Sequence, residues 1–227
     1  MGTLLQKLGI GVQHRIVSIV GSGGKTTLMY ALARECAQKG ETVGITTTTH
    51  IKRPNEPDFL LADSKSIPLA AGRVTAVGKG AEHGKMAMPS HDELDELCRR
   101  ASRVFIEADG ARMLPIKYPN ATEPVILPCT DLVIAVTGLS ALGKPLKDVC
   151  CRVQLAQEML GVHPDEPVTP NIIAALLIKG YSRWNPVIVL NQADDDRVRV
   201  QAEQAAALLR SGGFQKIVIT SLKQEVL

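Results

Sequence analysis

The sequence has no long apolar run and little excess charge of either sign. None of its apolar stretches approaches the roughly 20 residues that a helix needs to cross a bilayer. The formal net charge of +3 is too small to indicate a nucleic-acid or membrane partner. The N-terminus lacks a signal-peptide cleavage pattern, and Gln6 stands where a myristoylation motif needs Ser or Thr. We therefore expect a cytoplasmic protein that binds neither nucleic acid nor membranes.

The cysteines form no disulfide framework. The five of them stand at positions 36, 98, 129, 150 and 151, without any C-x-x-C spacing. An odd number and scattered placement are typical of reduced thiols in a cytoplasm. Two interpretations stay open for the adjacent Cys150 and Cys151: a reactive or metal-binding pair, or buried packing residues.

Apolar runs and helical patterns alternate along the chain. Hydrophobic residues make up 45% of the 227 residues, which is enough to bury the core of one domain. Strands are predicted at 15–20, 42–46, 73–78, 103–107, 131–136, 186–191 and 216–220, and helices at 26–39, 91–101, 170–180 and 195–210. Ser90 and Glu93 form a capping box before the second helix; Thr169 and Pro170 begin the third, and Gly180 ends it. This alternation favours an α/β three-layer sandwich with a mostly parallel sheet.

The segment GSGGKTT at residues 21–27, here called the phosphate loop, lies between the first predicted strand and the first predicted helix. Its three glycines let backbone N–H groups approach an anion, and the helix directs its positive dipole end at the same place. Lys25 would bridge the β- and γ-phosphates, and the Thr26 hydroxyl would bind Mg²⁺. The nucleotide contacts are predicted to be Gly21, Ser22, Gly23, Gly24, Lys25, Thr26 and Thr27. We expect a single P-loop NTPase-like domain over 1–227, with a small insertion at about 52–90, that binds ATP or GTP.

The phosphate loop departs from the usual G-x-x-x-x-G-K-[ST] pattern, because Ile19 stands at the first glycine position. The shorter form resembles the loops of Mur-type ligases and of the deviant-loop ATPases related to partitioning proteins. The latter carry a lysine where this chain has Val20, so their lysine mechanism is not expected here. Two alternatives are a glycine turn with an incidental Lys-Thr, and a dinucleotide-binding loop, which needs glycine in place of Thr26.

Acidic and hydroxyl side chains follow two other predicted strands. Glu107 and Asp109, two residues apart, are alternative Mg²⁺ ligands, and Asp109 joins Lys25 as a predicted catalytic residue. An acidic strand end with an Asp-Gly turn is the plainer interpretation. In ITTTTHI, Thr48 and His50 are candidates to contact Mg²⁺ or phosphate; a β-prone run and a surface histidine are the alternatives.

A base-binding pattern lies near the C-terminus. Asn191 and Asp194 follow a strand with the N-x-x-D spacing of guanine-recognising GTPases, although Gln192 replaces the usual lysine. Ser221 follows the last strand, where those proteins have a serine-containing loop that contacts guanine. The alternative is that the carboxylates at 194–196 serve as the acidic N-terminus of the next helix.

Five segments together resemble one family. They are VGSGGKTTLMYALA, TTTTHI, AVGKG, EADGARMLPIKYPNATEPVILP and VTGLSALGKPL, and they span most of the chain. They are similar to the YqeC family, described as accessory proteins of selenium-dependent molybdenum hydroxylases. The resemblance implies a P-loop fold and a nucleotide-dependent role in maturing a molybdenum enzyme or its cofactor. It also draws attention to Arg112 and Lys117 as contacts for an anionic ligand, with Lys144 and Arg152 as further basic candidates.

The functional expectation is a Mg²⁺-dependent, slow NTPase that assists maturation of a molybdenum hydroxylase. Slow turnover is expected because the sequence offers neither a water-positioning residue nor an arginine finger. A carrier or chaperone that binds nucleotide without hydrolysis is one alternative. An ATP-dependent ligase or kinase acting on a small acid is another, although the length leaves no room for the third domain of a ligase.

Overall fold

The computed structural model describes residues 2–55, 59–62 and 67–225. The chain divides into two compact units. The first unit comprises residues 1–19, 26–110 and 125–132, and the second comprises 20–25, 111–124 and 133–227. The prediction of one domain with an insertion at about 52–90 stays a prediction.

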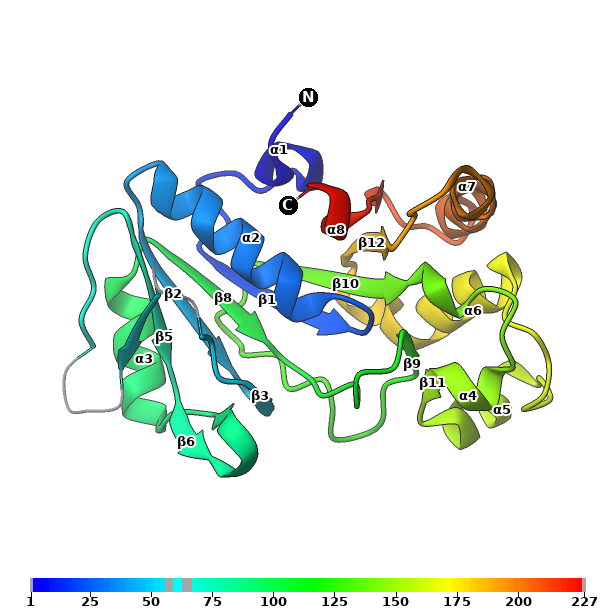
Figure 1. Cartoon of the computed structure of the whole chain (residues 1–227), viewed down its shortest axis with the longest axis horizontal. Coiled ribbons are helices and arrows are strands. Elements are labelled where there is room, and N and C mark those ends of the chain that lie inside the picture. The colour runs from blue at the N-terminus through cyan, green and yellow to red at the C-terminus, as the bar shows by residue number, and fades with distance from the viewer. Residues whose placement is uncertain (1, 56–58, 63–66, 226–227) are drawn as a thin grey trace. The chain divides into compact units, whose positions relative to one another are not determined.

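The main sheet of the first unit has five strands, in the order β1-β8-β2-β5-β4 (Figure 1). Their bounds are β1 Ile16–Gly21, β2 Thr42–Thr47, β4 Phe59–Ala62, β5 Arg73–Val77 and β8 Arg103–Glu107. All four pairings between these neighbours are parallel. Every residue of β1 and β8 is buried, as expected for strands that helices cover on both faces.

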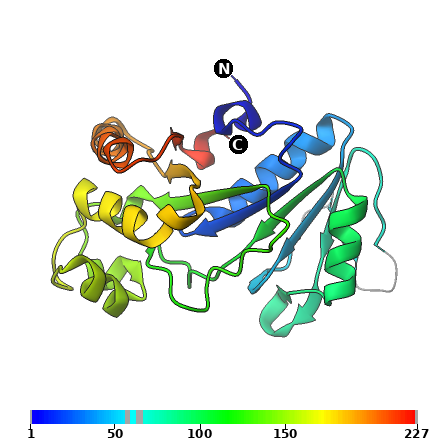
Figure 2. The ribbon, with the colours of Figure 1, turned by 180° about the vertical axis from the view of Figure 1, so that it is seen from behind.

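Helices cover both faces of the first unit's sheet. The helix α2 (Lys25–Gln38) runs across the face that Figure 1 shows, and α3 (His91–Arg100) lies on the opposite face, in front in Figure 2. The capping box predicted for Ser90 and Glu93 is present at the start of α3. Leu97 of α3 packs into a core cluster with residues of the sheet such as Ile106, and a Cβ added to Gly44 would lie 2.5 Å from Leu97 Cδ1. The short helix α1 (Leu4–Leu8) precedes β1.

A small antiparallel sheet overlaps the region where the insertion was expected. Its order is β3-β7-β6, with bounds β3 His50–Lys52, β6 Lys79–Ala81 and β7 Lys85–Ala87, and the 3-10 turn η1 Glu82–Gly84 joins the last two. Part of that region, residues 56–58 and 63–66, lies outside the described residues.

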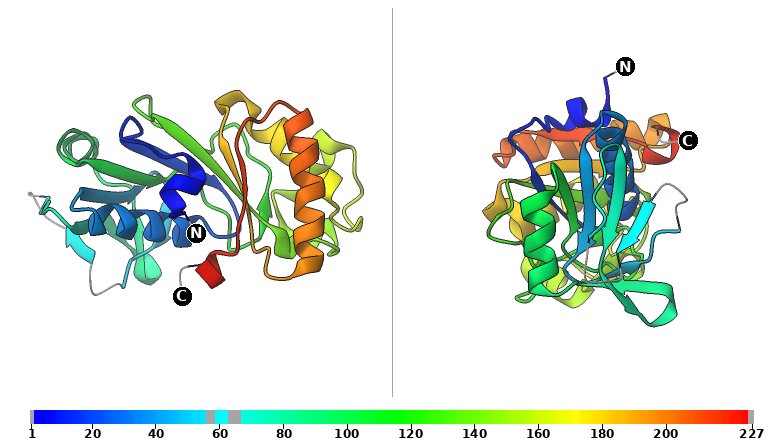
Figure 3. Two further views of the ribbon diagram at one scale, coloured as in Figure 1. Left: turned by 90° about the horizontal axis from the view of Figure 1, so that it is seen from above. Right: turned by 90° about the vertical axis from the view of Figure 1, so that its left-hand side faces the viewer.

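The second unit has three parallel strands in the order β10-β12-β13. Their bounds are β10 Leu132–Gly138, β12 Val187–Asn191 and β13 Ile217–Ile219, and a separate parallel pair joins β9 (Ile116–Lys117) to β11 (Cys150–Cys151). The helical elements are η2 Leu139–Ala141, α4 Leu146–Val149, α5 Val153–Leu160, α6 Pro170–Tyr181, η3 Ser182–Trp184, α7 Asp196–Ser211 and α8 Leu222–Glu225. Figure 3 shows α7, in orange, beside α6 in yellow, and the two helices pack together.

The predicted α/β fold with a mostly parallel sheet is confirmed, and the architecture is that of a P-loop NTPase-like sandwich. Each predicted strand and helix is present, with small shifts at its ends. The prediction that Gly180 ends its helix is wrong, because α6 continues through Tyr181. Close packing explains this glycine: a Cβ there would lie 2.8 Å from Pro119 Cδ. Across the described ranges, none of the helices has the length and apolar character needed to span a membrane.

Candidate functional site

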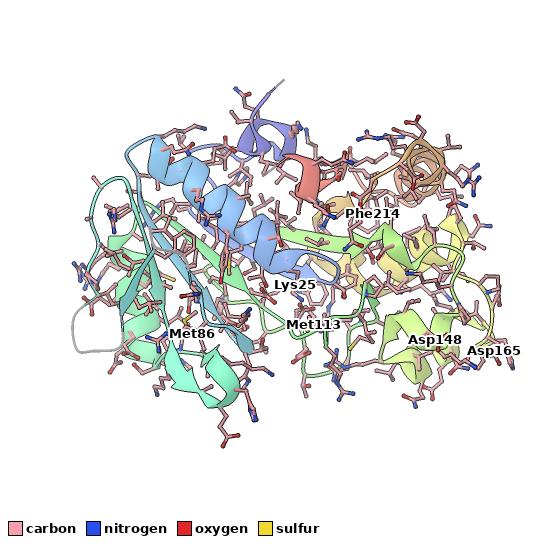
Figure 4. The ribbon with its side chains drawn as sticks, in the orientation of Figure 1. Lys25, Met86, Met113, Asp148, Asp165 and Phe214 are labelled. Atoms are coloured by element: carbon pink, nitrogen blue, oxygen red, sulfur yellow. The ribbon has the colours of Figure 1, made fainter. Side chains whose placement is uncertain are left out.

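The phosphate loop has a backbone that only glycine adopts readily. Gly21, Gly23 and Gly24 have φ angles of 91°, 77° and 129°. They stand in the second unit, at the end of β1, and the chain enters α2 at Lys25, which Figure 4 labels. Two of the other predicted contacts differ in exposure, since Ser22 is buried and Thr27 is exposed.

Neighbouring backbone approaches this loop closely. A Cβ added to Gly21 would lie 2.1 Å from the carbonyl oxygen of Val136, and one added to Gly23 would lie 2.5 Å from the Cα of Gly138. The Ser22 N–H donates to the Val136 carbonyl at 2.8 Å, and the Ser22 hydroxyl donates to the Leu114 carbonyl. The loop is therefore fixed against the end of β10, and its glycines are required by space as well as by φ.

Lys25 lies folded over the same loop. Its side chain is buried, and Nζ donates to the Gly21 carbonyl at 2.8 Å. An ammonium beside a glycine-rich turn, whose backbone N–H groups can face an anion, is suited to phosphate binding. The positive φ angles and this lysine are compatible with the predicted phosphate loop.

Asn191, at the end of β12, is hydrogen-bonded to the phosphate loop. Its side chain is buried; Nδ2 donates to the Gly23 carbonyl at 2.8 Å, and Oδ1 accepts from the Leu222 N–H at 3.1 Å. The register aligns Asn191 with Gly138, the residue against which Gly23 packs. Sequence reasoning assigned Asn191 only to base recognition and missed this link, which depends on the pairing of β10 with β12.

The other two residues of the predicted base site lie together. The Ser221 hydroxyl donates to Asp194 Oδ1, and Asp194 is exposed. Asp195 is the N-cap of α7, since its Oδ1 accepts from the Val198 N–H at 2.9 Å. Asp195 therefore serves as the helix cap, whereas Asp194 accepts the hydrogen bond from Ser221. Whether the three side chains bind guanine stays a prediction.

In the first unit, Thr26 meets one of the two candidate carboxylates. Thr26 Oγ1 donates to Glu107 Oε2 at 2.6 Å. Glu107 ends β8 and is aligned with Ile19 of β1 and Thr47 of β2, so these three residues form one row across the carboxyl ends of the strands. Asp109, two residues further on, is fully buried.

The Thr26–Glu107 pair fits a nucleotide-bound Mg²⁺. In such sites one or two protein oxygens bind the ion, and phosphates and water complete its shell. Over the described ranges, no cluster of three or more His, Cys, Asp or Glu side chains could hold a metal on its own. A hydroxyl and a carboxylate at 2.6 Å are suited to an ion brought in with the nucleotide.

Backbone carbonyls engage the hydroxyls of the threonine run. Thr46, Thr47 and Thr48 donate to the carbonyls of Val77, Glu107 and Val125 at 2.7, 2.9 and 3.1 Å. These bonds tie the end of β2 to its neighbours, so Thr48 has a structural partner in this conformation. His50 is exposed at the start of β3.

The two basic residues highlighted by the family resemblance have different surroundings. Arg112 is exposed in a turn and has a φ of 50°. Lys117 is buried in β9, and its Nζ lies 3.0 Å from Glu123 Oε2, an oxygen that also accepts from Arg152 Nη2. Burial acts to raise the pKa of Glu123, but the hydrogen bonds from Arg152 and Lys117 outweigh it and hold this pKa below its ordinary value. Sequence reasoning missed Glu123.

The adjacent cysteines form the short strand β11. Cys150 and Cys151 are both buried. Burial, together with the neighbouring Cys151, raises the pKa of the Cys150 thiol to about 12. A thiol in these surroundings stays protonated and unreactive at neutral pH, which favours the packing interpretation.

Comparison with known proteins supports the family assignment. A family model described as "YqeC protein" matches residues 17–154. A protein of Escherichia coli (strain K12), described as "Uncharacterized protein YqeC", is 32% identical over 183 residues, which cover 75% of this chain and 71% of that protein. The matched range includes the phosphate loop and the Glu107 strand. The chain belongs to the YqeC family.

Proposed function

We propose that this protein is a cytoplasmic Mg²⁺-dependent nucleotide-binding protein that hydrolyses its nucleotide slowly. The observation that carries the proposal is the contact between the hydroxyl of Thr26, directly after the phosphate-loop lysine, and the carboxylate of Glu107, at 2.6 Å. A hydroxyl and a strand-end carboxylate in this relation form the Mg²⁺ half of a P-loop site. The glycine loop before them, with its positive φ angles, is proposed as the phosphate half.

Each residue then has a defined task. Backbone N–H groups of the phosphate loop and the N-terminus of α2 would bind the phosphate oxygens, with Lys25 over the β- and γ-phosphates. Thr26 and Glu107 would hold Mg²⁺, which neutralises the charge that develops during phosphoryl transfer. Asp109, buried beyond the same strand, is proposed to orient the attacking water or a water bound to Mg²⁺.

Asn191, Asp194 and Ser221 support GTP as the nucleotide. Asp194 would accept from guanine N1–H and the 2-amino group, which adenine does not offer in this arrangement. Ser221 holds that carboxylate, and Asn191 joins the base side to the phosphate side through Gly23. If these side chains instead contact groups that guanine and adenine share, the protein would bind GTP and ATP equally well.

We further propose that nucleotide turnover serves the maturation of a molybdenum hydroxylase. This role rests on what the resemblance to the YqeC family implies, and that resemblance is carried by segments of this chain such as EADGARMLPIKYP and VTGLSALGKPL. A partner from that machinery would supply the group that positions water or stabilises the transition state, since slow hydrolysis by the isolated protein is expected.

Phosphate release from purified protein separates an enzyme from a carrier. The wild type is incubated with Mg²⁺ and GTP or ATP, beside Lys25→Ala and an exposed control, Lys216→Ala. Slow release that Lys25→Ala abolishes and Lys216→Ala preserves supports the NTPase. Tight binding without release shows a carrier, and release that appears only with an added small acid shows a ligase or kinase.

A further inference from the structure

Arg152 has a side-chain nitrogen whose hydrogen-bonding capacity is not used within the protein. Its Nη2 pairs with Glu123, whereas Nη1 is buried and has no hydrogen-bond partner among the described residues. A guanidinium offers only donors, and buried donors in folded proteins are almost always matched to an acceptor. The guanidinium therefore has one nitrogen paired within the protein and one nitrogen that can donate to an acceptor supplied by a ligand.

The backbone conformation at Arg152 is unusual for a residue other than glycine. Arg152 stands between β11 and α5 with φ 64° and ψ 49°, the left-handed conformation that non-glycine residues rarely adopt. It makes no side-chain cap for α5, so capping does not account for the residue or its conformation. Strained residues of this kind concentrate where proteins hold ligands.

The strand pair that precedes Arg152 is connected to the segment that contacts the phosphate loop. The carbonyls of Leu114 and Pro115 accept from Ser22 Oγ and from the Gly138 N–H. Two residues after Pro115, at most about 7 Å along the chain, Lys117 is aligned with Cys151, the residue before Arg152. All of these contacts lie within the second unit.

We propose that Arg152 is the anion-binding residue of a second subsite, which takes a phosphate or carboxylate group of a small acidic substrate beside the nucleotide. Glu123 orients the guanidinium through Nη2 and leaves the planar Nη1 edge for the ligand. This inference rests on the proposed function, since the subsite would hold the molecule on which nucleotide turnover acts. The substrate class is thus an oxyanion-bearing small molecule.

Calorimetric titration of the nucleotide-loaded protein tests the subsite. The wild type is saturated with Mg²⁺ and a non-hydrolysable GTP analogue, which fills the phosphate loop, and is titrated separately with inorganic phosphate and with acetate. We expect one added anion per chain for at least one probe, and the preferred probe identifies the substrate group. Arg152→Lys should weaken this binding roughly tenfold to hundredfold, the loss typical of one charge-assisted hydrogen bond. Arg199→Lys, an exposed change on α7, should leave it unchanged.

A second variant distinguishes a ligand site from a structural ion pair. Glu123→Gln keeps a side-chain oxygen that can accept from Arg152 Nη2 and so preserves the orientation of the guanidinium, but it removes a negative charge beside the bound anion. Phosphate binding should therefore tighten, whereas weaker binding by a folded Glu123→Gln protein contradicts the proposal. Equal binding by the wild type and Arg152→Lys, or no binding of either probe to the wild type, overturns it. If the nucleotide analogue itself does not bind, the proposed function fails, and the same variants titrated with acetate without nucleotide still decide the role of Arg152.

Discussion

Gly23 offers a sharp test of the phosphate-loop geometry because the chain contains a matched control. Gly23 and Gly40 both have left-handed backbones, with φ of 77° and 83°. A Cβ at Gly23 would lie 2.5 Å from the backbone of Gly138 and 2.7 Å from the Pro115 carbonyl, whereas nothing lies within 4 Å of one at Gly40. Alanine at either position has the same conformational cost, so the difference between the two variants isolates the contact with neighbouring backbone.

The magnitudes follow from these two terms. Forcing alanine into the left-handed region costs about 1–2 kcal/mol, and overpacking against fixed backbone adds about 1–3 kcal/mol at Gly23 only. For a chain of this size, 1 kcal/mol corresponds to roughly 2–4 °C in melting temperature. Gly40→Ala should therefore melt roughly 2–8 °C below the wild type, and Gly23→Ala roughly 2–12 °C lower still.

Calorimetry and nucleotide titration check both parts of this prediction. Gly23→Ala should also lose at least roughly tenfold in nucleotide affinity because the loop N–H groups are displaced, while Gly40→Ala binds as the wild type does. The reasoning is refuted if the two variants melt together and bind nucleotide equally well.

Three further predictions concern single side chains. Glu107→Gln should weaken nucleotide binding at least roughly tenfold in Mg²⁺ but leave binding in EDTA unchanged; equal losses in both titrations would argue against a metal role. Asn191→Ala should lower the free energy of unfolding by about 1–3 kcal/mol, since it leaves the Gly23 carbonyl and the Leu222 N–H without partners, and urea denaturation measures this loss. Glu123 has a folded-state pKa below its ordinary value of 4.5, so its stabilising contribution is present above that value and is lost as the pH falls through the folded-state pKa. As the pH is lowered from 6, the urea midpoint of unfolding should therefore fall more steeply for the wild type than for Glu123→Gln. Parallel curves for the two proteins would show that the ionised Glu123 carboxylate does not stabilise the fold.

Local patterns were sufficient to predict much of the fold. The buried strands are β-branched runs, the capping box at Ser90 fixes the start of α3, and the glycine cluster followed by Lys25 occurs between a strand and a helix, as expected. These features depend on residues close in sequence, and the sequence contains them directly. The ends of helices and strands were predicted less accurately. Gly180 resembled a helix stop, but a glycine is needed there because Pro119 packs against it.

Contacts between segments far apart in the chain could not be predicted from the sequence. The sequence did not distinguish Glu107 from Asp109, whereas in the structure the Glu107 carboxylate accepts a hydrogen bond from Thr26. Lys117 resembled a free anion contact, yet it pairs with Glu123. Asn191 fitted a base-recognition motif, but its bond to Gly23 depends on the pairing of β12 with β10, which periodicity does not encode.

The central claim is that the phosphate loop binds a Mg²⁺-nucleotide. The most direct measurement is a thermal-shift comparison of GTP, ATP and CTP, each with Mg²⁺, on the wild type and on Lys25→Ala. A ligand that binds the folded state raises the melting temperature according to its affinity. The account predicts a clear rise for the wild type, largest with GTP, and little or none for Lys25→Ala. No rise with any nucleotide, or equal rises in the wild type and Lys25→Ala, would contradict the claim, and equal rises for all three nucleotides would refute the guanine assignment of Asn191 and Asp194.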